Sequence, residues 1–298
     1  MITEIIKETY HTLTRKVDRS FFLHNEQKSY PIHAETQQWK SYVFLRRKYN
    51  RMLAALPETQ PEQKNSRIIW WCWLQGADQA PELCKACLAS LHRELPDYDL
   101  RIIDYSCLGE YLDIPSYILD KRKRGIIGGA HFSDIIRVML LVKFGGVWID
   151  SSVYCTGYQV PLFDEPLFVY QNWKFDLTYA SIASNWLISA SIGHPILYAT
   201  QEMLLDYWKS NDKAIDYYLF HHLFHLAADR YSDLWKAVPR FSNIPPHILQ
   251  YELFRPYSEE RFAQIKGMSG FHKLNWKAPE INGDTKGSFF EHLIQNAR

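Results

Sequence analysis

The sequence of 298 residues has few cysteines and no long apolar run. Its five cysteines are an odd number spread thinly through a large chain, which argues against a disulfide framework and favours a reducing compartment. The densest apolar run, residues 135–142, is broken by Arg137 and is much shorter than the ~20 residues that a membrane-spanning helix needs. The first residues also lack the pattern of a signal peptide. We therefore expect a cytoplasmic protein, either free or at the inner face of a membrane.

The sequence also lacks a strong charge of either sign. Lys and Arg number 34 and Asp and Glu number 33, which gives a formal net charge of +1 and argues against a general binder of nucleic acid. In contrast, 47% of the residues are hydrophobic and 15% are aromatic, so the chain can bury a large core and is not expected to be disordered.

The order of hydrophobic patterns predicts two parts. Residues 1–65 are expected to form a charged, helical N-terminal extension, which ends in a polar segment containing Pro57 and Pro61. Residues 66–298 alternate strand and helix patterns, which predicts an α/β domain with a mostly parallel sheet flanked by helices. The expected strands lie near residues 67–75, 98–105, 147–150, 167–170 and 185–190, and the expected helices near 81–95, 130–146, 194–210 and 216–236.

The strongest chemical signal lies in the helix expected at residues 130–146 and in the strand that follows it. We expect Ser133 to cap this helix and Gly145 with Gly146 to end it. Asp134 and Arg137 are spaced i, i+3 on one face of an otherwise apolar helix. They could be an ion pair that only satisfies itself at the edge of the core, or part of a ligand site.

Asp150 favours a ligand site because it closes an apolar strand, and ligands of open α/β sheets bind at the carboxyl ends of strands. There, carboxylates can hold ribose hydroxyls or a divalent ion, and a guanidinium can bind sugar or phosphate oxygens.

The pattern SD-x-x-R followed by L-x-x-x-GG-x-W-x-D resembles the DXD-containing sugar-binding region of GT-A glycosyltransferases. Residues 66 to about 290 resemble the capsular polysaccharide synthesis family, whose relatives include glycosyltransferase family 32. The resemblance implies a GT-A fold with a Rossmann-like nucleotide-binding sheet. It also implies that Asp134, Arg137 and Asp150 bind the donor.

One residue departs from the DXD pattern. Ser152 stands where the second Asp would ligate manganese, and a hydroxyl is a poorer ligand than a carboxylate for a hard dication. We therefore expect Mn²⁺ or Mg²⁺ to bind weakly, or to bind through Asp150, the donor diphosphate and a further group. The resemblance offers His272 as that further metal ligand. It places Lys273, Trp276 and Lys277 over the donor diphosphate; a basic surface loop is the alternative.

Other candidates have weaker signals. Trp70 and Trp71 are expected to be core residues, whereas Trp73 or Gln75, at the end of the first strand, could touch the nucleotide base. By the family pattern, the candidates for the donor or acceptor sugar are Ser184, Asn185 and His247, although most buried Asn and His residues are structural. Packing is also the expected role of the histidines spaced i, i+4 at 221 and 225 and of the lone CxxC at 84–87.

Together these features predict an enzyme that transfers a hexose from a nucleotide-diphosphate donor, of the UDP type, to a growing surface or capsular polysaccharide on a lipid carrier. The relatives in family 32 imply retention of configuration, and no nucleophile or base stands out. The expected partners are the nucleotide sugar, a glycan or lipid-linked acceptor and a peripheral membrane surface, without nucleic acid. The alternative is a non-catalytic nucleotide-sugar or glycan-binding protein with a degenerate metal site. A hydrolase is disfavoured because no flanking pair of acidic residues is recognisable.

Overall fold

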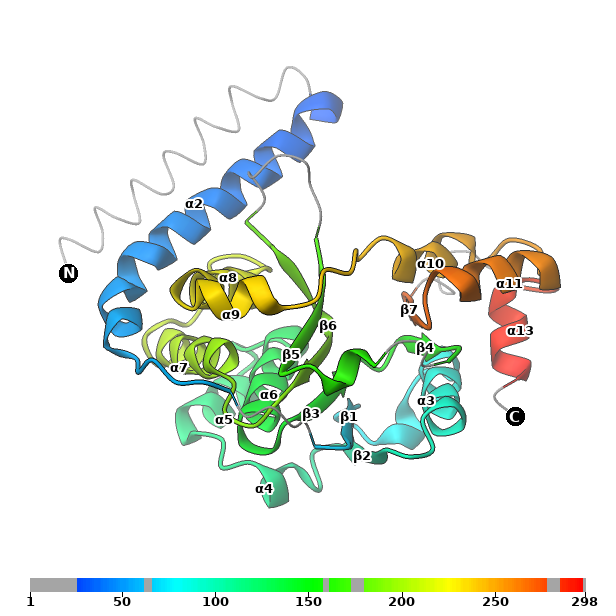
Figure 1. Ribbon diagram of the computed structural model, residues 1–298, viewed down its shortest axis with the longest axis horizontal. Coiled ribbons are helices and arrows are strands. Elements are labelled where there is room, and N and C mark those ends of the chain that lie inside the picture. The colour runs from blue at the N-terminus through cyan, green and yellow to red at the C-terminus, as the bar shows by residue number, and fades with distance from the viewer. Residues whose placement is uncertain (1–25, 62–65, 158–160, 173–179, 278–284, 297–298) are drawn as a thin grey trace.

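The computed structural model describes most of the chain, and its centre is a mixed sheet (Figure 1). The described residues are 26–61, 66–157, 161–172, 180–277 and 285–296, with side chains from residue 36 onwards. The sheet consists of β1 (Ile68–Cys72), β2 (Asp99–Ile103), β3 (Gly146–Ile149), β5 (Leu167–Gln171) and β6 (Ala183–Ala190) in the order β2-β1-β3-β6-β5. β1 is parallel to β2 and β3, while β6 is antiparallel to β3 and β5. Four strands of this sheet thus point the same way, as the sequence predicts.

Helices lie on both sides of the sheet, and a short ribbon lies at one end (Figure 1). The ribbon is formed by the antiparallel strands β4 (Val153–Cys155) and β7 (Phe271–Lys273). The longer helices are α2 (Glu26–Ala55), α3 (Glu82–Glu94), α6 (Gly129–Phe144), α7 (Pro195–Ser210), α8 (Leu219–Arg230) and α11 (Glu259–Met268). The shorter ones are α4 (Leu108–Tyr111), α5 (Ser116–Lys123), α9 (Ser232–Ala237), α10 (Ile248–Glu252) and α13 (Phe289–Gln295), with single 3₁₀ turns η2 (Ala77–Gln79), η3 (Leu162–Asp164) and η4 (Pro245–His247).

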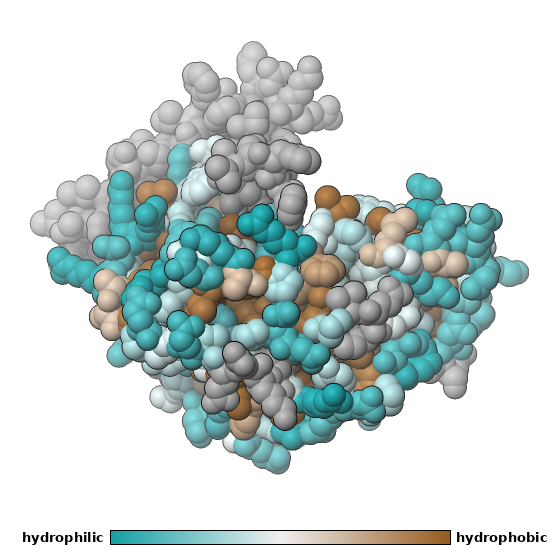
Figure 2. All heavy atoms as spheres, viewed as in Figure 1, coloured by the Kyte–Doolittle hydropathy of each residue, from teal (hydrophilic) through white to brown (hydrophobic). Residues whose placement is uncertain are grey.

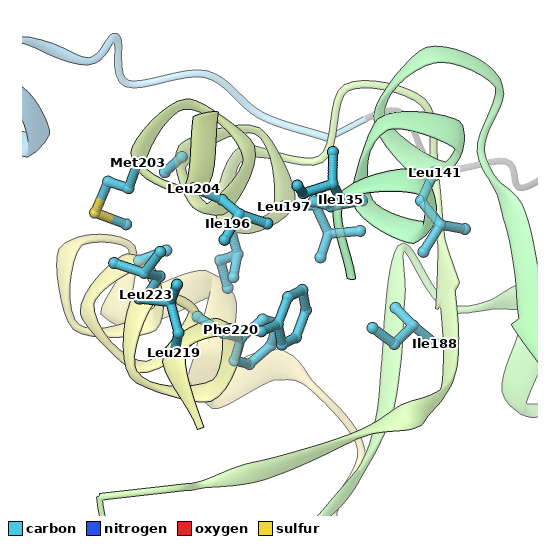
Figure 3. Close-up of a cluster of buried hydrophobic side chains, with 14 of the residues drawn as sticks. Ile135, Leu141, Ile188, Ile196, Leu197, Met203, Leu204, Leu219, Phe220 and Leu223 are labelled. Atoms are coloured by element: carbon cyan, nitrogen blue, oxygen red, sulfur yellow. The ribbon is translucent and has the colours of Figure 1, made fainter. Parts of the chain in front are cut away.

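The two faces of the sheet bury different residues because side chains alternate along each strand. Trp70 faces the cluster formed with α6, α7 and α8, whereas Ile69 and Trp71 face the cluster formed with α3. Figure 3 shows Ile188 of β6 below Leu141 of α6, with Phe220 of α8 beside it in the same buried cluster. The expectation that Trp70 and Trp71 are core residues is confirmed, since both are fully buried.

Helix α2 packs along α8 with one apolar face. Its buried residues Tyr42, Leu45, Tyr49 and Leu53 recur every three or four positions, and the Tyr42 hydroxyl donates a hydrogen bond to Asp229 of α8. Within the described ranges, no helix is long and apolar enough to cross a membrane. On the face drawn in Figure 2, hydrophobic residues are interspersed among hydrophilic ones.

The predicted helix at residues 130–146 is correct, but its predicted cap is not. Ser133 lies inside α6, and Gly128 occupies the N-cap position. The glycines do end the helix, because Gly145 and Gly146 have φ values of 65° and 90°, which side chains disfavour. A Cβ on Gly146 would also lie 2.5 Å from the carbonyl oxygen of Ile68, so β1 and β3 can approach only with glycine there.

Two other expectations need correction. The predicted helix at residues 216–236 is divided into α8 and α9, which join at Tyr231. The segment around His272, expected to be a loop, forms β7, because its backbone pairs with β4.

The CxxC cysteines lie buried in α3, where burial raises the pKa of Cys84 to about 11, in line with a structural role.

Candidate functional site

The sheet brings the ends of two parallel strands to one edge. Trp73 follows β1 and Asp150 follows β3, so both lie at the carboxyl edge of the sheet. Only Gly145 separates α6 from β3, so the helix runs back along the strand and its N-terminal half lies near the carboxyl end of β3. Asp134 and Arg137 belong to this half of α6 and therefore lie at the same edge. This is the region where α/β sheets bind ligands.

Arg137 is the centre of a buried polar cluster. Its side chain is 4% exposed, and its guanidinium donates hydrogen bonds to Asp134 Oδ1 and, at 2.8 Å, to Asp150 Oδ1. The guanidinium carbon also lies 4.9 Å from the ring centroid of Trp148. Arg137 Nε is buried and has no hydrogen-bond partner among the described residues. The predicted convergence of these three charged residues is therefore present.

Asp150 lies between two cations. Its Oδ1 accepts hydrogen bonds from Arg137 and, at 2.8 Å, from Trp148 Nε1, while its Oδ2 lies 3.2 Å from Lys273 Nζ. Burial alone would raise the pKa of Asp150, but the charges of Lys273 and Arg137 outweigh burial and lower it. Asp150 is thus held ionised at neutral pH.

Asp134 has a different environment, although it shares Arg137. Its Oδ1 also accepts a hydrogen bond of 2.8 Å from Asn185 Nδ2, and His131 Nδ1 lies 3.9 Å from its Oδ2. Burial raises the pKa of Asp134 to about 6, since it outweighs the favourable charge of Arg137 and acts with the repulsion from Asp150. The two carboxyl groups of the cluster therefore differ in proton affinity.

Lys273 reaches the cluster from the other end of the sequence. In the β4–β7 ribbon Val153 pairs with Lys273, and Leu274 N donates a 2.8 Å hydrogen bond to the carbonyl oxygen of Ser152. This ladder fixes Lys273 beside Asp150, where its Nζ donates a 2.6 Å hydrogen bond to Ser152 Oγ. The predicted donor-site residues Lys273, Asp150 and Ser152 are therefore in direct contact.

The predicted metal ligands do not come together. His272 points away from Lys273 along β7, is fully buried and contacts Thr156 Oγ1 through Nε2 at 2.9 Å. Burial lowers the pKa of His272 to about 4. In the part of the chain that the structure describes, no group of three or more His, Cys, Asp or Glu residues could hold a metal ion.

The charges around Asp150 also fit a divalent ion poorly. Both carboxylate oxygens already contact hydrogen-bond donors, and the Ser152 hydroxyl is bonded to an ammonium. With an effective dielectric constant of about 20, a dication about 4 Å from Lys273 Nζ would be repelled by roughly 8 kcal/mol. The side chains at this position do not match a metal site.

Trp73, one of the two residues predicted to contact the base, packs against Trp276, which the resemblance places over the diphosphate. The rings of Trp73 and Trp276 meet edge to face with centroids 5.4 Å apart, and Lys277 Nζ lies 5.2 Å from the Trp276 centroid. Gln75 is exposed. Two segments that are far apart in the sequence thus supply partly exposed aromatic rings at the same edge of the sheet.

Two predicted sugar-contacting residues are held by backbone groups. The Ser184 hydroxyl is buried and donates to the carbonyl oxygen of Tyr170 at 3.0 Å. His247 Nδ1 lies 2.7 Å from the carbonyl oxygen of Asn243, and its pKa is lowered by burial and by the charge of Lys273. The structure thus places Asn185, not Ser184, in the charged cluster.

Two residues that the sequence analysis did not place in the site lie near the cluster in the structure, and one of them, His221, was expected only to pack. Trp148 donates to Asp150, and the GG-x-W-x-D pattern was its available signal. His221 has a buried Nδ1 without a partner among the described residues, and its pKa falls to about 3 through burial and the charge of Arg137. The neighbouring His222 does have an acidic partner, since its Nε2 lies 2.9 Å from Asp216 Oδ2.

The fold and cluster define an α/β protein with a polar, two-cation site at the carboxyl edge of its parallel strands. The chain belongs to the family of capsular polysaccharide synthesis proteins, whose model matches residues 19–293. This confirms the family that the sequence resembles.

Individual relatives are distant. The chain is similar to the O-glycosyltransferase braB of Annulohypoxylon truncatum, with 22% identity over 180 residues. The match covers 55% of this chain and 43% of that protein, so the chain spans less than half the length of this relative.

Two solved structures are also similar. The PaToxG glycosyltransferase has 13% identity and a TM-score of 0.42, and the match covers 88% of this chain and 97% of that one. The bacterial N-acetylglucosamine transferase NleB has 9% identity and a TM-score of 0.30, with 73% and 98% covered.

Proposed function

We propose that the chain is a glycosyltransferase that moves a hexose from a nucleotide-diphosphate donor of the UDP type to a surface or capsular polysaccharide acceptor, with retention of configuration. Membership of the family supports the class of acceptor. The observation that carries the proposal is the placement of two cations, Arg137 and Lys273, around Asp150 at the carboxyl edge of the sheet.

The proposed reaction exchanges one bond for another at the anomeric carbon. The bond from that carbon to the diphosphate oxygen breaks and leaves its electron pair on the diphosphate. The acceptor hydroxyl oxygen bonds to the carbon, and its proton passes to the departing diphosphate. Positive groups fixed near the leaving oxygen stabilise the charge that develops there, and fixed positions for both substrates lower the entropic cost.

Each part of the site has a role in this proposal. Lys273 and Arg137 face the diphosphate, while Asp150 keeps both cations in place and binds a ribose hydroxyl. Asp134 and Asn185 hold Arg137 from the other side. Trp73 and Trp276 offer aromatic rings to the base, with Gln75 and Lys277 beside them.

The proposed partners are the nucleotide sugar and a glycan on a lipid carrier, and the carrier would be met at the inner face of the membrane. Ser184 and His247 remain proposed contacts for the sugars. A structure with the nucleotide sugar bound tests these contacts, because it would show which residues touch the sugar of the donor.

A panel of UDP- and GDP-sugars tests the activity. The purified full chain is expected to release nucleoside diphosphate from one donor, faster with acceptor glycan present. The second candidate, a non-catalytic nucleotide-sugar or glycan-binding protein, is favoured by Ser152 in place of an acid. Tight binding of a donor without turnover would support this second candidate and contradict the transferase.

A further inference from the structure

The contacts of Lys273 resemble those of a bound cation more than those of a surface lysine. Its Nζ lies 3.2 Å from Asp150 Oδ2 and 2.6 Å from Ser152 Oγ, and its side chain is only 22% exposed. By the resemblance to the DXD pattern, Asp150 stands at its first position, and Ser152 stands where the second Asp would ligate manganese. The ammonium therefore lies between the same two positions.

The backbone fixes this arrangement. Residues on both sides of the contact belong to the β4–β7 ladder, with hydrogen bonds of 2.8 Å from Leu274 N to Ser152 O and from Thr156 N to Gly270 O. A lysine held in this way loses less side-chain entropy on binding a ligand than a freely rotating one. The positive charge is therefore in place before any donor arrives.

The ammonium still has capacity to bind. An ammonium has three N–H groups, and among the described residues Asp150 and Ser152 accept from two of them. The third can donate to a phosphate oxygen, and Arg137 keeps a buried Nε without a described partner nearby. Charged hydrogen bonds of this kind are among the strongest in proteins.

We propose that the Lys273 ammonium takes the place of the divalent ion, so that this chain binds the donor diphosphate and stabilises its departure without a metal. This inference rests on the proposed glycosyltransferase function. Ser152 is then the matching partner of Lys273, because a second carboxylate at that position would attract a dication beside the ammonium.

The test measures UDP binding by calorimetry and donor turnover, each with excess EDTA and with Mn²⁺. The parent chain is expected to bind UDP equally well in both conditions, and Mn²⁺ alone is expected to produce no binding heat. Lys273→Met should weaken UDP binding by about tenfold or more, as expected for the loss of a charged hydrogen bond, and Lys273→Arg should restore part of it.

Two further variants separate the role of the charge from an effect on folding. Lys236→Met removes an exposed lysine that pairs with Asp233 on the surface and should leave UDP binding unchanged. The double variant Lys273→Ala with Ser152→Asp should bind UDP only when Mn²⁺ is present, because it removes the ammonium and restores the acidic oxygen.

The outcomes distinguish the two proposals. A parent chain that binds and turns over a donor only with Mn²⁺, or a Lys273→Met variant that keeps full affinity in EDTA, would overturn the metal-free inference and leave the transferase standing. A parent chain that binds no nucleotide diphosphate or nucleotide sugar in either condition would refute the proposed function and the inference with it.

Discussion

Replacing Arg137 by Met should destabilise the folded chain strongly. The side chain is 4% exposed and contacts both the buried Asp134 and the partly exposed Asp150, so the substitution removes the cation that these two carboxylates share and leaves Asp134 without an arginine or lysine partner among the described residues. Removing one partner of a buried ion pair costs about 3–5 kcal/mol. The indole of Trp148 also loses its cation neighbour at 4.9 Å.

That cost should appear as a clear change in melting temperature. For a chain of this size, about 1 kcal/mol shifts the midpoint by roughly 2–4 °C, so Arg137→Met should melt roughly 10 °C lower. Calorimetry or circular dichroism measures this. Arg137→Lys keeps the charge but lacks the planar guanidinium that contacts both carboxylates. Its melting temperature should lie between those of the parent chain and Arg137→Met.

A matched control is Arg124→Met, which removes an arginine paired with Asp120 where both side chains are 59% exposed. Its effect should be within about 0.5 kcal/mol, as is usual for surface pairs. If Arg137→Met melts at the same temperature as the parent chain, the ion pairs of Arg137 do not stabilise the fold. That result would refute the argument that its burial makes them necessary. UDP affinity measured well below the midpoint then shows whether Arg137 also binds the donor.

Three other predictions follow from the candidate site. Asp150→Asn can still accept from Trp148 but loses the charge between its two cations, so turnover should fall by about tenfold or more; unchanged turnover in a steady-state assay would contradict the assignment. Burial raises the pKa of Asp134 from 3.8 in the unfolded chain to about 6 in the folded chain. Ionised Asp134 therefore destabilises the folded chain fully above pH 6, and this destabilisation disappears as the pH falls toward 3.8. Asp134→Asn should therefore gain stability relative to the parent by about 1–3 kcal/mol as pH rises through this window, and melts that show a constant difference would count against it. Trp276→Ala should weaken UDP binding by about 1–3 kcal/mol but leave inorganic diphosphate binding unchanged, and an equal loss for both would exclude base stacking.

The longer elements of the fold could be predicted because their periodicity is strong. The apolar run at β1 and the amphipathic pattern of α3 correspond to a strand and a helix in the structure. The end of α6 was also predictable, since Gly145 and Gly146 have the backbone angles that favour glycine. The division of residues 216–236 was not, because both α8 and α9 continue the apolar pattern across Tyr231.

The local part of the candidate site could be predicted, whereas its long-range part could not. Asp134 and Arg137 share one face of a helix, and Asp150 follows the next strand. This spacing, together with the rule that ligands bind at the carboxyl ends of strands, predicts that the three residues meet. Nothing in the three-residue strand β7 predicts that it pairs with β4. Without that pairing, the sequence does not show that Lys273 points toward Asp150 while His272 points away from it. The division of the chain at residue 65 and the roles of the site residues in donor binding stay predictions.

The ribbon that carries Lys273 also has a consequence for how the chain folds. Asp134, Arg137 and Asp150 can meet as soon as α6 docks on β3, because a single residue joins the two elements. Lys273 is 121 residues from Ser152 along the chain, and contacts between such distant segments form slowly because a large loop must close first. We therefore expect refolding chains to pass through a stage in which the acidic half of the cluster exists without its second cation. Affinity for an anionic ligand should then appear only with the last folding phase, when β7 joins β4.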